Sequence, residues 1–203
     1  MSQIMRALVF AIVFGWASGT AYAQDSAKPQ AVAPSQSNAA AAQAAQAASP
    51  AANPEDVSSP DAILAATYGV ISGPAGQKRD WDRFRSLFIP DARLISARLT
   101  DDGSYSVRSL SPNDYAARAD AYFAKNGFAE REIARKAERY GNIMQIFSTY
   151  ESRHDAKDAQ PFARGINSFQ LLFDGKRWWV VTIFWQEETP DNPLPKEFLP
   201  ASN

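Results

Sequence analysis

The last third of the chain constrains the fold most strongly, because it holds two apolar strands that follow one another closely. The segments Phe162 to Phe173 and Trp178 to Glu187 have strand composition, and Asp174-Gly175-Lys176 between them predicts a hairpin. The second strand is apolar on both sides: Trp179, Val181, Ile183 and Trp185 alternate with Trp178, Val180, Thr182 and Phe184. Because a sheet with two apolar faces must be covered on both, this hairpin requires a layer on each side.

Three helices are predicted upstream, enough to cover one face. The first begins at Ser59 as N-cap, presents Ile63, Leu64, Thr67, Tyr68 and Ile71 on one face, and ends at Gly73-Pro74. The second spans Asp80 to Phe88 and ends before Pro90. The third starts with a capping box, Ser111 and Asp114, and ends at Asn126-Gly127.

The other segments between the helices and the hairpin are predicted to be strands. Ala92 to Leu99 and Tyr105 to Leu110 flank a turn at residues 101–104, and two more strands span Phe128 to Arg139 and Asn142 to Arg153. The predicted fold is therefore α+β: three helices packed in a curved, mainly antiparallel sheet of about six strands. Either the C-terminal tail, Pro190 to Pro200, covers the second face, or a homodimer packs sheet to sheet; we expect a homodimer.

The N-terminal segment predicts export. Arg6 precedes an apolar run of ten residues, Ala7 to Trp16, which is too short to span a bilayer of ~30 Å. Ala21-Tyr22-Ala23 fits the small-x-small cleavage pattern, so residues 1–23 are predicted to be a signal peptide cleaved after Ala23. The protein is then periplasmic or secreted, with no membrane attachment after cleavage.

The next segment, residues 24–57, consists mainly of Ala, Gln, Pro and Ser. Such a composition buries too little apolar surface to offset the entropy of ordering the chain. It predicts a disordered linker, followed by one folded domain over residues 58–203.

Charge and composition exclude several classes of function. The formal net charge is −1, which gives no sign of nucleic-acid binding. The chain has no Cys and one His, His154, so neither a thiolate zinc site nor a His-rich metal site is expected. Phosphate-loop, nucleophile-elbow and His-Glu-x-x-His motifs are absent from the sequence, and no cofactor is expected.

The order helix, helix, hairpin, helix and four strands resembles the nuclear transport factor 2-like (NTF2-like) superfamily over Pro60 to Glu188. The resemblance rests on Asp80 to Phe88 followed by Asp91-Ala92, and on the ending Gly175 to Val181 with Phe184-Trp185. The SnoaL-like and ketosteroid-isomerase-like members of this superfamily form a cone with a pocket at its open end. The fold hosts enzymes and non-enzymes, so the resemblance does not set the function.

The resemblance to ketosteroid-isomerase-like proteins argues against their chemistry. The position of their general-base Asp falls on Ser96, and that of their second acid falls near Phe169, whose neighbours Ser168 and Gln170 are not acids either. Tyr68 matches their aromatic partner on the first helix. His154 is interpreted as a solvated loop residue, and Glu130, Glu132 and Glu138 as solvated residues of an edge strand. We therefore predict no catalytic residue.

The remaining candidates are polar or amphipathic residues on elements that line a cone. Aromatic walls with a few polar groups suit a small organic ligand. The length of the last turn decides whether Arg164 or Asn167 shares a face with Trp185, and the sequence leaves both open. The predicted pocket residues are Tyr68, Arg98, Tyr122, Tyr150, Arg164, Asn167 and Trp185.

Three functions are compatible with these features. The first is a small-molecule-binding module without catalysis. The second is a lyase, isomerase or cyclase with an unusual catalytic pair, such as Tyr68 with Glu132 or Glu151. The third is a structural or assembly module whose dimer surface is the functional part. The first is the preferred hypothesis, because the expected cone has aromatic walls and lacks the acids of the isomerases.

Overall fold

The structure is a computed structural model that describes residues 49–100 and 102–201. The predicted signal peptide and the linker up to residue 48 lie outside these residues. Regular structure begins before Ser58, the predicted start of the domain: Pro54–Val57 forms a short 3-10 helix, η1. Val57 packs in the core, and Asp56 accepts hydrogen bonds from Arg83 Nε at 2.7 Å and Nη2 at 2.8 Å.

Three α-helices follow, as predicted. Helix α2 spans Pro60–Ile71, with the Ser59 hydroxyl accepting from the Ala62 amide, and helix α4 spans Pro112–Phe123 behind the predicted capping box. Helix α3, Trp81–Ser86, is shorter than expected. Phe88, predicted to end this helix, instead begins the first strand, and the pairing of that strand is irregular between Phe88 and Arg93, around Pro90. Proline lacks the amide hydrogen that regular strand pairing needs.

Six strands form one mixed, mainly antiparallel sheet, which confirms the predicted fold class. The strands are β1 (Phe88–Leu99), β2 (Tyr105–Leu110), β3 (Ala129–Tyr140), β4 (Ile143–Arg153), β5 (Ala163–Phe173) and β6 (Trp178–Glu187). Their order across the sheet is β2-β1-β6-β5-β4-β3, and β1 pairs with β6 in parallel. The two edges are therefore β2 and β3.

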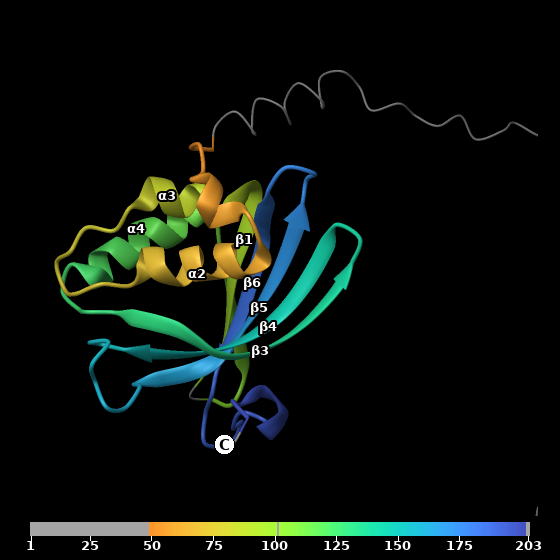
Figure 1. Ribbon diagram of the computed structural model, residues 1–203. Helices are drawn as coiled ribbons and strands as arrows, with labels where there is room; N and C mark the ends of the chain where they lie inside the picture. The colour runs from red at the N-terminus through yellow and green to blue at the C-terminus, as the bar shows by residue number, and fades with distance from the viewer. Residues whose placement is uncertain (1–48, 101, 202–203) are drawn as a thin grey trace, which may run out of the picture. The chain divides into compact units, whose positions relative to one another are not determined.

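The sheet curves around the three helices, which lie on its inner face (Figure 1). The core between them contains α2 residues such as Ile63 and Leu64, Phe84 from α3, and sheet residues such as Phe169 and Val180. This arrangement is the cone that the resemblance to NTF2-like proteins implies. No helix among residues 49–100 and 102–201 is long and apolar enough to cross a membrane.

The C-terminal tail lies against the outer face of the sheet. Its 3-10 helix η2, Lys196–Phe198, follows the sheet on the side away from the helices (Figure 1). The Phe198 ring lies 5.7 Å from that of Phe147, and the Phe198 carbonyl accepts a hydrogen bond of 2.6 Å from the buried Thr149 hydroxyl. The tail covers only part of this face, because Phe184 stays 44% exposed. The homodimer stays a prediction.

Strand β6 departs from the predicted strict alternation. The pairing with β5 shifts by one residue between Leu171↔Val180 and Gln170↔Thr182, leaving Val181 unpaired in a β-bulge. The bulge reverses which residues face inward, so Trp178 and Val180 share the buried side with Ile183 instead of opposing it. The predicted face of Trp179, Val181, Ile183 and Trp185 is therefore wrong.

Candidate functional site

An open cavity of about 380 Å³ lies between helices α2 and α4 and the inner face of the sheet. Its size falls within the range of small-molecule sites, which are concave and largely apolar with a few polar groups. Many aromatic side chains contribute to its walls: Tyr68, Phe84, Tyr115, Tyr122, Phe123, Phe128, Tyr150, Phe162, Phe169 and Trp185.

Six of the seven predicted pocket residues line this cavity: Tyr68, Arg98, Tyr122, Tyr150, Asn167 and Trp185. Arg164 does not, and its prediction is wrong. It lies in a separate surface depression, where its guanidinium binds the Glu188 carboxylate at 2.8 and 3.1 Å.

The geometry of the last hairpin explains why Asn167 is in the cavity and Arg164 is not. Phe173 pairs with Trp178, so four residues form the loop, and the bulge at Val181 then places Asn167 directly opposite Trp185. The sequence-based expectation depended on turn length alone and did not include this bulge. Arg164 is three positions from Asn167 and therefore points to the other face.

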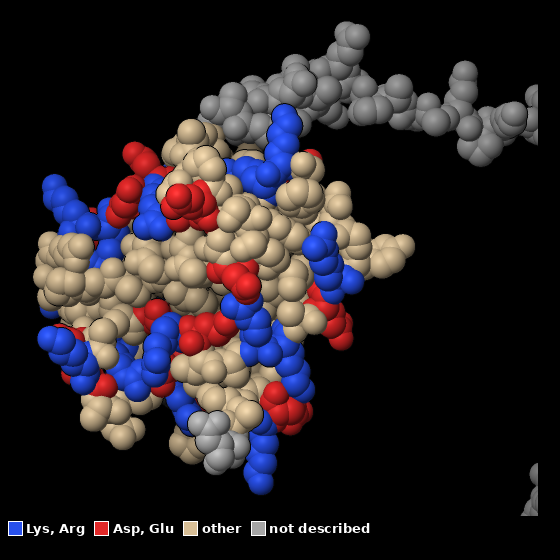
Figure 2. All heavy atoms as spheres, in the orientation of Figure 1, with Lys and Arg blue, Asp and Glu red and all other residues tan. Residues whose placement is uncertain are grey.

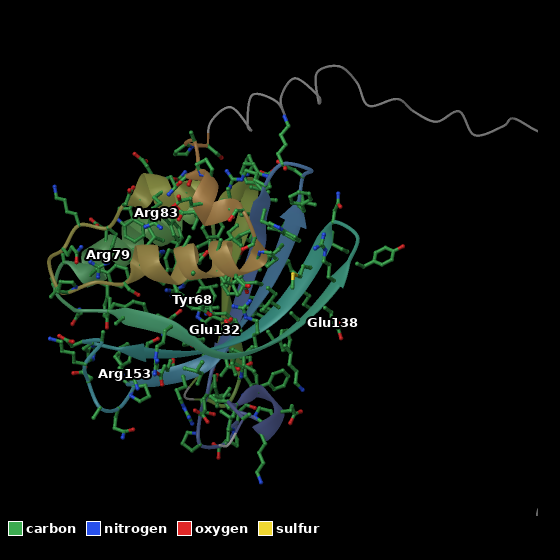
Figure 3. The ribbon with its side chains drawn as sticks, viewed as in Figure 1. Tyr68, Arg79, Arg83, Glu132, Glu138 and Arg153 are labelled. Atoms are coloured by element: carbon green, nitrogen blue, oxygen red, sulfur yellow. The ribbon has the colours of Figure 1, made fainter. Side chains whose placement is uncertain are left out.

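Tyr68 is the centre of a buried hydrogen-bonded group. Its hydroxyl lies 2.7 Å from the Ser148 hydroxyl and accepts a hydrogen bond of 3.1 Å from Asn167 Nδ2. Ser148 in turn donates to Glu132 Oε2 at 2.5 Å. Figure 3 shows Tyr68 extending from α2 toward the sheet on the side of Glu132. Burial, with the nearby Glu130 charge, raises the pKa of Tyr68, so this hydroxyl keeps its proton.

Glu130 on β3 places a carboxylate in the cavity. Its Oε2 accepts a hydrogen bond of 2.7 Å from the Ser152 hydroxyl, and its Oε1 a longer one of 3.4 Å from Asn167 Nδ2. Some of its surface stays accessible because it faces the cavity, yet protein atoms surround it closely. Burial raises the pKa of Glu130 to about 7, although the bonds from Ser152 and Asn167 act in the opposite direction.

The interpretation of the β3 glutamates as solvated edge residues is therefore wrong for Glu130 and Glu132 and holds for Glu138. Glu130 and Glu132 share the inner face of β3, where they pair with Ser152 and Tyr150 of β4. A shift in pairing between Glu132 and Ala134 then turns Glu138 to the solvent side. The signal available in the sequence was the two-residue spacing of Glu130 and Glu132, which puts both on one face.

Three arginines line the opposite part of the cavity: Arg98 on β1, Arg108 on β2 and Arg118 on α4. We call them the arginine rim. All three are exposed, and none forms an ion pair with another residue that the structure describes. Only Arg98 was predicted; Arg108 reaches the cavity because it pairs with Ser96, which faces inward like Arg98 two residues later.

The charges of Glu130 and Arg98 both act on the Tyr150 hydroxyl. Burial raises the pKa of its hydroxyl, the Glu130 charge raises it further, and the Arg98 charge lowers it. Burial and Glu130 also raise the pKa of Tyr115. Both side chains border the cavity, so two protonated phenols are available there to a ligand.

Ser96 and Phe169, the positions compared with the two acids of ketosteroid-isomerase-like proteins, both border the cavity. His154 lies in an exposed bend after β4, as predicted, with its ring stacked 4.3 Å from that of Phe162. Among residues 49–100 and 102–201, no cluster of three or more His, Cys, Asp or Glu side chains is arranged to hold a metal ion.

Charges of both signs are mixed on the face of the molecule in Figure 2. Several pair on or beside β3: Arg131 Nε lies 2.6 Å from Glu151, and Arg135 contacts both Glu132 at 2.6 Å and Asp61 at 2.5 Å. The Glu151 carboxylate is thereby held outside the cavity.

Comparisons with known proteins find a likeness in structure alone. No family model matches the chain, and no curated protein matches its sequence. Among solved structures, a protein of unknown function with a cystatin-like fold from Nostoc punctiforme has 12% identity and a TM-score of 0.47, covering 66% of this chain and 90% of its own.

Two further solved structures are similar in the same way. An NTF2-like protein of unknown function from Methylobacillus flagellatus has 13% identity and a TM-score of 0.43, covering 64% of this chain and 95% of its own. A putative ketosteroid isomerase from Parabacteroides distasonis has 10% identity and a TM-score of 0.44, covering 64% and 89%. These likenesses concern the fold alone.

Proposed function

We propose, on the premise that this domain has the cone fold of NTF2-like proteins, that its cavity binds a small organic molecule. The observation that carries the proposal is the cavity of about 380 Å³, with aromatic walls and polar groups that converge on it from several elements. Glu130, Asn167 and Tyr68 contribute polar atoms on one side, and the arginine rim contributes charge on the other.

A thermal-shift screen of the full chain against a library of small organic compounds tests this proposal. A ligand present at 100 times its dissociation constant stabilises the folded state by about 2.7 kcal/mol. Ala119 lines the cavity on α4, whereas Ala117 on the same helix is exposed. A119F should abolish the shift by filling the cavity, and A117F should keep it. Ligands that bind both variants equally would place the binding site elsewhere and contradict the proposal.

A second candidate function, acid–base catalysis on the bound molecule, is favoured by Glu130. A general base must be able to reach its substrate and should have a pKa near the working pH. Glu130 faces the cavity, and burial raises its pKa to about 7. The two glutamates first considered are less suitable. Glu132 accepts a hydrogen bond from Ser148 and forms an ion pair with Arg135. Glu151 forms ion pairs with Arg131 and Arg153.

Hydrogen exchange distinguishes the two functions. Each ligand from the screen is incubated in D₂O with the wild type, E130Q or the surface control E138Q, and its carbon-bound deuterium is measured by mass spectrometry. Catalysis predicts uptake with the wild type and E138Q and none with E130Q. Binding of the ligand without uptake in any of the three proteins would exclude proton transfer at carbon and leave the binding function.

We also propose that the chain is exported, with residues 1–23 as a cleaved signal peptide and the following residues as a tether. The support is the pattern of Arg6, the apolar run and Ala21-Tyr22-Ala23. N-terminal sequencing of the protein recovered from a bacterial periplasm tests the proposal. A mature chain that begins at Gln24 is expected, and an intact Met1 would contradict cleavage.

A structural role through dimer formation is the third candidate. It is favoured by Phe184, which is 44% exposed on the outer face of the sheet beside the C-terminal tail. Sedimentation of the wild type and F184K measures dimer formation. The wild type is expected to be a dimer and F184K a monomer. A monomeric wild type at high concentration would remove this candidate.

A further inference from the structure

The two polar ends of the cavity lie on opposite sides of the cupped sheet. Arg98 and Arg108 come from β1 and β2 at one edge, Arg118 comes from α4, and Glu130 comes from β3 at the other edge. Strands β1 and β3 are four steps apart in the sheet, roughly 19 Å along its curved surface at ~4.8 Å a step. A ligand that spans the cavity therefore meets two different chemical environments.

The arginine end favours an anion. The three rim arginines outnumber the two glutamates that border the cavity, Glu130 and Glu187. Their guanidinium groups have no carboxylate partner among the described residues, so their donors are available to a ligand. A guanidinium fork matches a carboxylate with two parallel hydrogen bonds.

The glutamate end favours a hydrogen-bond donor. Glu130 Oε2 is held by Ser152 at 2.7 Å, whereas Oε1 has only the long contact of 3.4 Å from Asn167. A carboxylate oxygen accepts more than one hydrogen bond, so Oε1 has room for a donor from the cavity. Aromatic side chains line the walls between the two ends. Among them is Tyr150, whose pKa is raised by the charge of Glu130 and lowered by that of Arg98.

We propose that the cavity is selective for a bipolar organic acid, whose carboxylate binds the arginine rim and whose opposite end donates a hydroxyl hydrogen bond to Glu130. This inference rests on the proposed binding function and specifies its ligand class. The middle of the ligand is apolar, because aromatic side chains surround it.

Titration calorimetry with ω-(4-hydroxyphenyl)alkanoates of three, five and seven chain carbons tests the inference. Each acid is compared with its primary amide, which lacks the charge, and with the phenyl compound that lacks the hydroxyl. For the best-fitting length, removal of the hydroxyl should weaken binding about tenfold, as for a hydrogen bond to a charged group. Removal of the charge should weaken binding about fivefold for each rim arginine engaged.

Matched variants assign the two ends. R98Q and R108Q should weaken binding of the acid without affecting the amide, whereas R93Q, on the outward side of the same strand β1, should have no effect. E130Q should reduce the advantage of the hydroxyl compound over the phenyl compound, because a neutral amide oxygen accepts a weaker hydrogen bond than a carboxylate, and E138Q should retain the full advantage. All four positions other than Glu130 are exposed, so these substitutions test binding without disturbing the core.

The outcomes separate this inference from the function on which it rests. Amides that bind as tightly as the acids, or a hydroxyl effect that is undiminished in E130Q, would overturn the ligand class and leave small-molecule binding intact. Failure of every phenylalkanoate to bind would also overturn the ligand class. The broader function would then fail only if the library screen were negative as well.

Discussion

At the scale of single residues, Glu130 shows how an edge strand can carry a functional group. Edge strands usually expose their charged side chains to water. Glu130 instead faces the cavity, because it shares the inner face of β3 with Glu132 and pairs with Ser152 of the neighbouring strand. Its raised pKa is a consequence of that enclosure, since burial disfavours the charged form.

The stability of the domain should therefore depend on pH through Glu130. Its pKa is raised from 4.5 to about 7, so the folded state holds this proton more tightly than the unfolded state does. Its contribution is fully present below pH 4.5 and is lost as the pH rises through about 7. Between pH 5 and pH 8 we expect a loss on the order of 2 kcal/mol from this group.

Urea unfolding of E130Q and E138Q at these two pH values measures this contribution. Between pH 5 and pH 8, the difference in unfolding free energy between the wild type and E130Q should change by about 2 kcal/mol. E138Q should follow the wild type, because Glu138 is exposed and makes no ion pair in the described residues. Parallel pH profiles for all three proteins would show that Glu130 titrates as an ordinary surface acid.

Gly165 of β5 is a second residue whose identity the tertiary structure requires. A Cβ added there would lie 2.3 Å from the Gln186 carbonyl oxygen and 2.7 Å from the Tyr150 hydroxyl oxygen. We expect G165A to reduce the unfolding free energy by about 2 kcal/mol, because a backbone oxygen must move. In G69A on α2 a Cβ would meet nothing within 4 Å, so that variant should instead gain about 0.5–1 kcal/mol of helix stability. If chemical denaturation gave equal changes in unfolding free energy for G165A and G69A, the close contacts at Gly165 would not be what requires glycine there.

At the scale of elements, the connection between α2 and α3 depends on one buried arginine. Arg79 donates hydrogen bonds to the carbonyls of Ile71 at 2.9 Å, Gly73 at 2.7 Å, Gln77 at 2.7 Å and Pro74 at 3.3 Å. Its guanidinium also lies 4.8 Å from the centre of a cavity-lining ring, Phe123. Figure 3 shows Arg79 beside the helices, where it connects the end of α2 to this loop.

Loss of Arg79 should destabilise this connection strongly. R79M keeps the apolar stem but leaves several loop carbonyls without donors, so we expect a loss of about 2–4 kcal/mol. The exposed neighbour Lys78 provides the control, and K78M should stay within about 0.5 kcal/mol of the wild type. Thermal unfolding followed by circular dichroism measures both. A stable R79M would mean that water replaces the guanidinium without cost.

Two β-bulges determine which strand residues face the cavity. The shift near Ile133 turns Glu138 away from the side of Glu130, and the shift at Val181 brings Ile183 to the side of Val180. Each inserts one residue and thereby reverses the alternation beyond it. The strands themselves were predictable from apolar alternation and turn residues. The bulges were not, because they arise where a curved sheet must pack around the helices.

At the scale of the whole molecule, the C-terminal tail replaces part of the second layer that the apolar sheet requires. Phe198 packs against Phe147, lies under the Lys136 ammonium at 4.7 Å and accepts the Thr149 hydrogen bond. This contact connects the last residues to the middle of the sheet. The tail that the sequence allowed as an alternative to the dimer is therefore present on this face.

Removal of the Phe198 ring should expose this part of the sheet. We expect F198A to lose about 1 kcal/mol of unfolding free energy and to associate more readily, because a half-buried aromatic side chain is lost from an apolar face. The exposed neighbour provides the control, and E197A should behave like the wild type. Chemical denaturation and sedimentation measure the two effects. Unchanged stability would show that the tail contributes no packing energy.

Local sequence patterns were enough to predict three helices, six strands, the α+β class and five of the residues that line the cavity: Tyr68, Arg98, Tyr122, Tyr150 and Trp185. These depend on local capping, turn residues and apolar periodicity, which act over a few neighbouring positions. The folded structure was needed to show that Glu130 faces the cavity, that Arg108 and Arg118 complete its rim, and that Asn167 and not Arg164 shares the cavity face with Trp185. These outcomes depend on strand register, on β-bulges and on the enclosure of a carboxylate by residues distant in the chain, which no local pattern encodes.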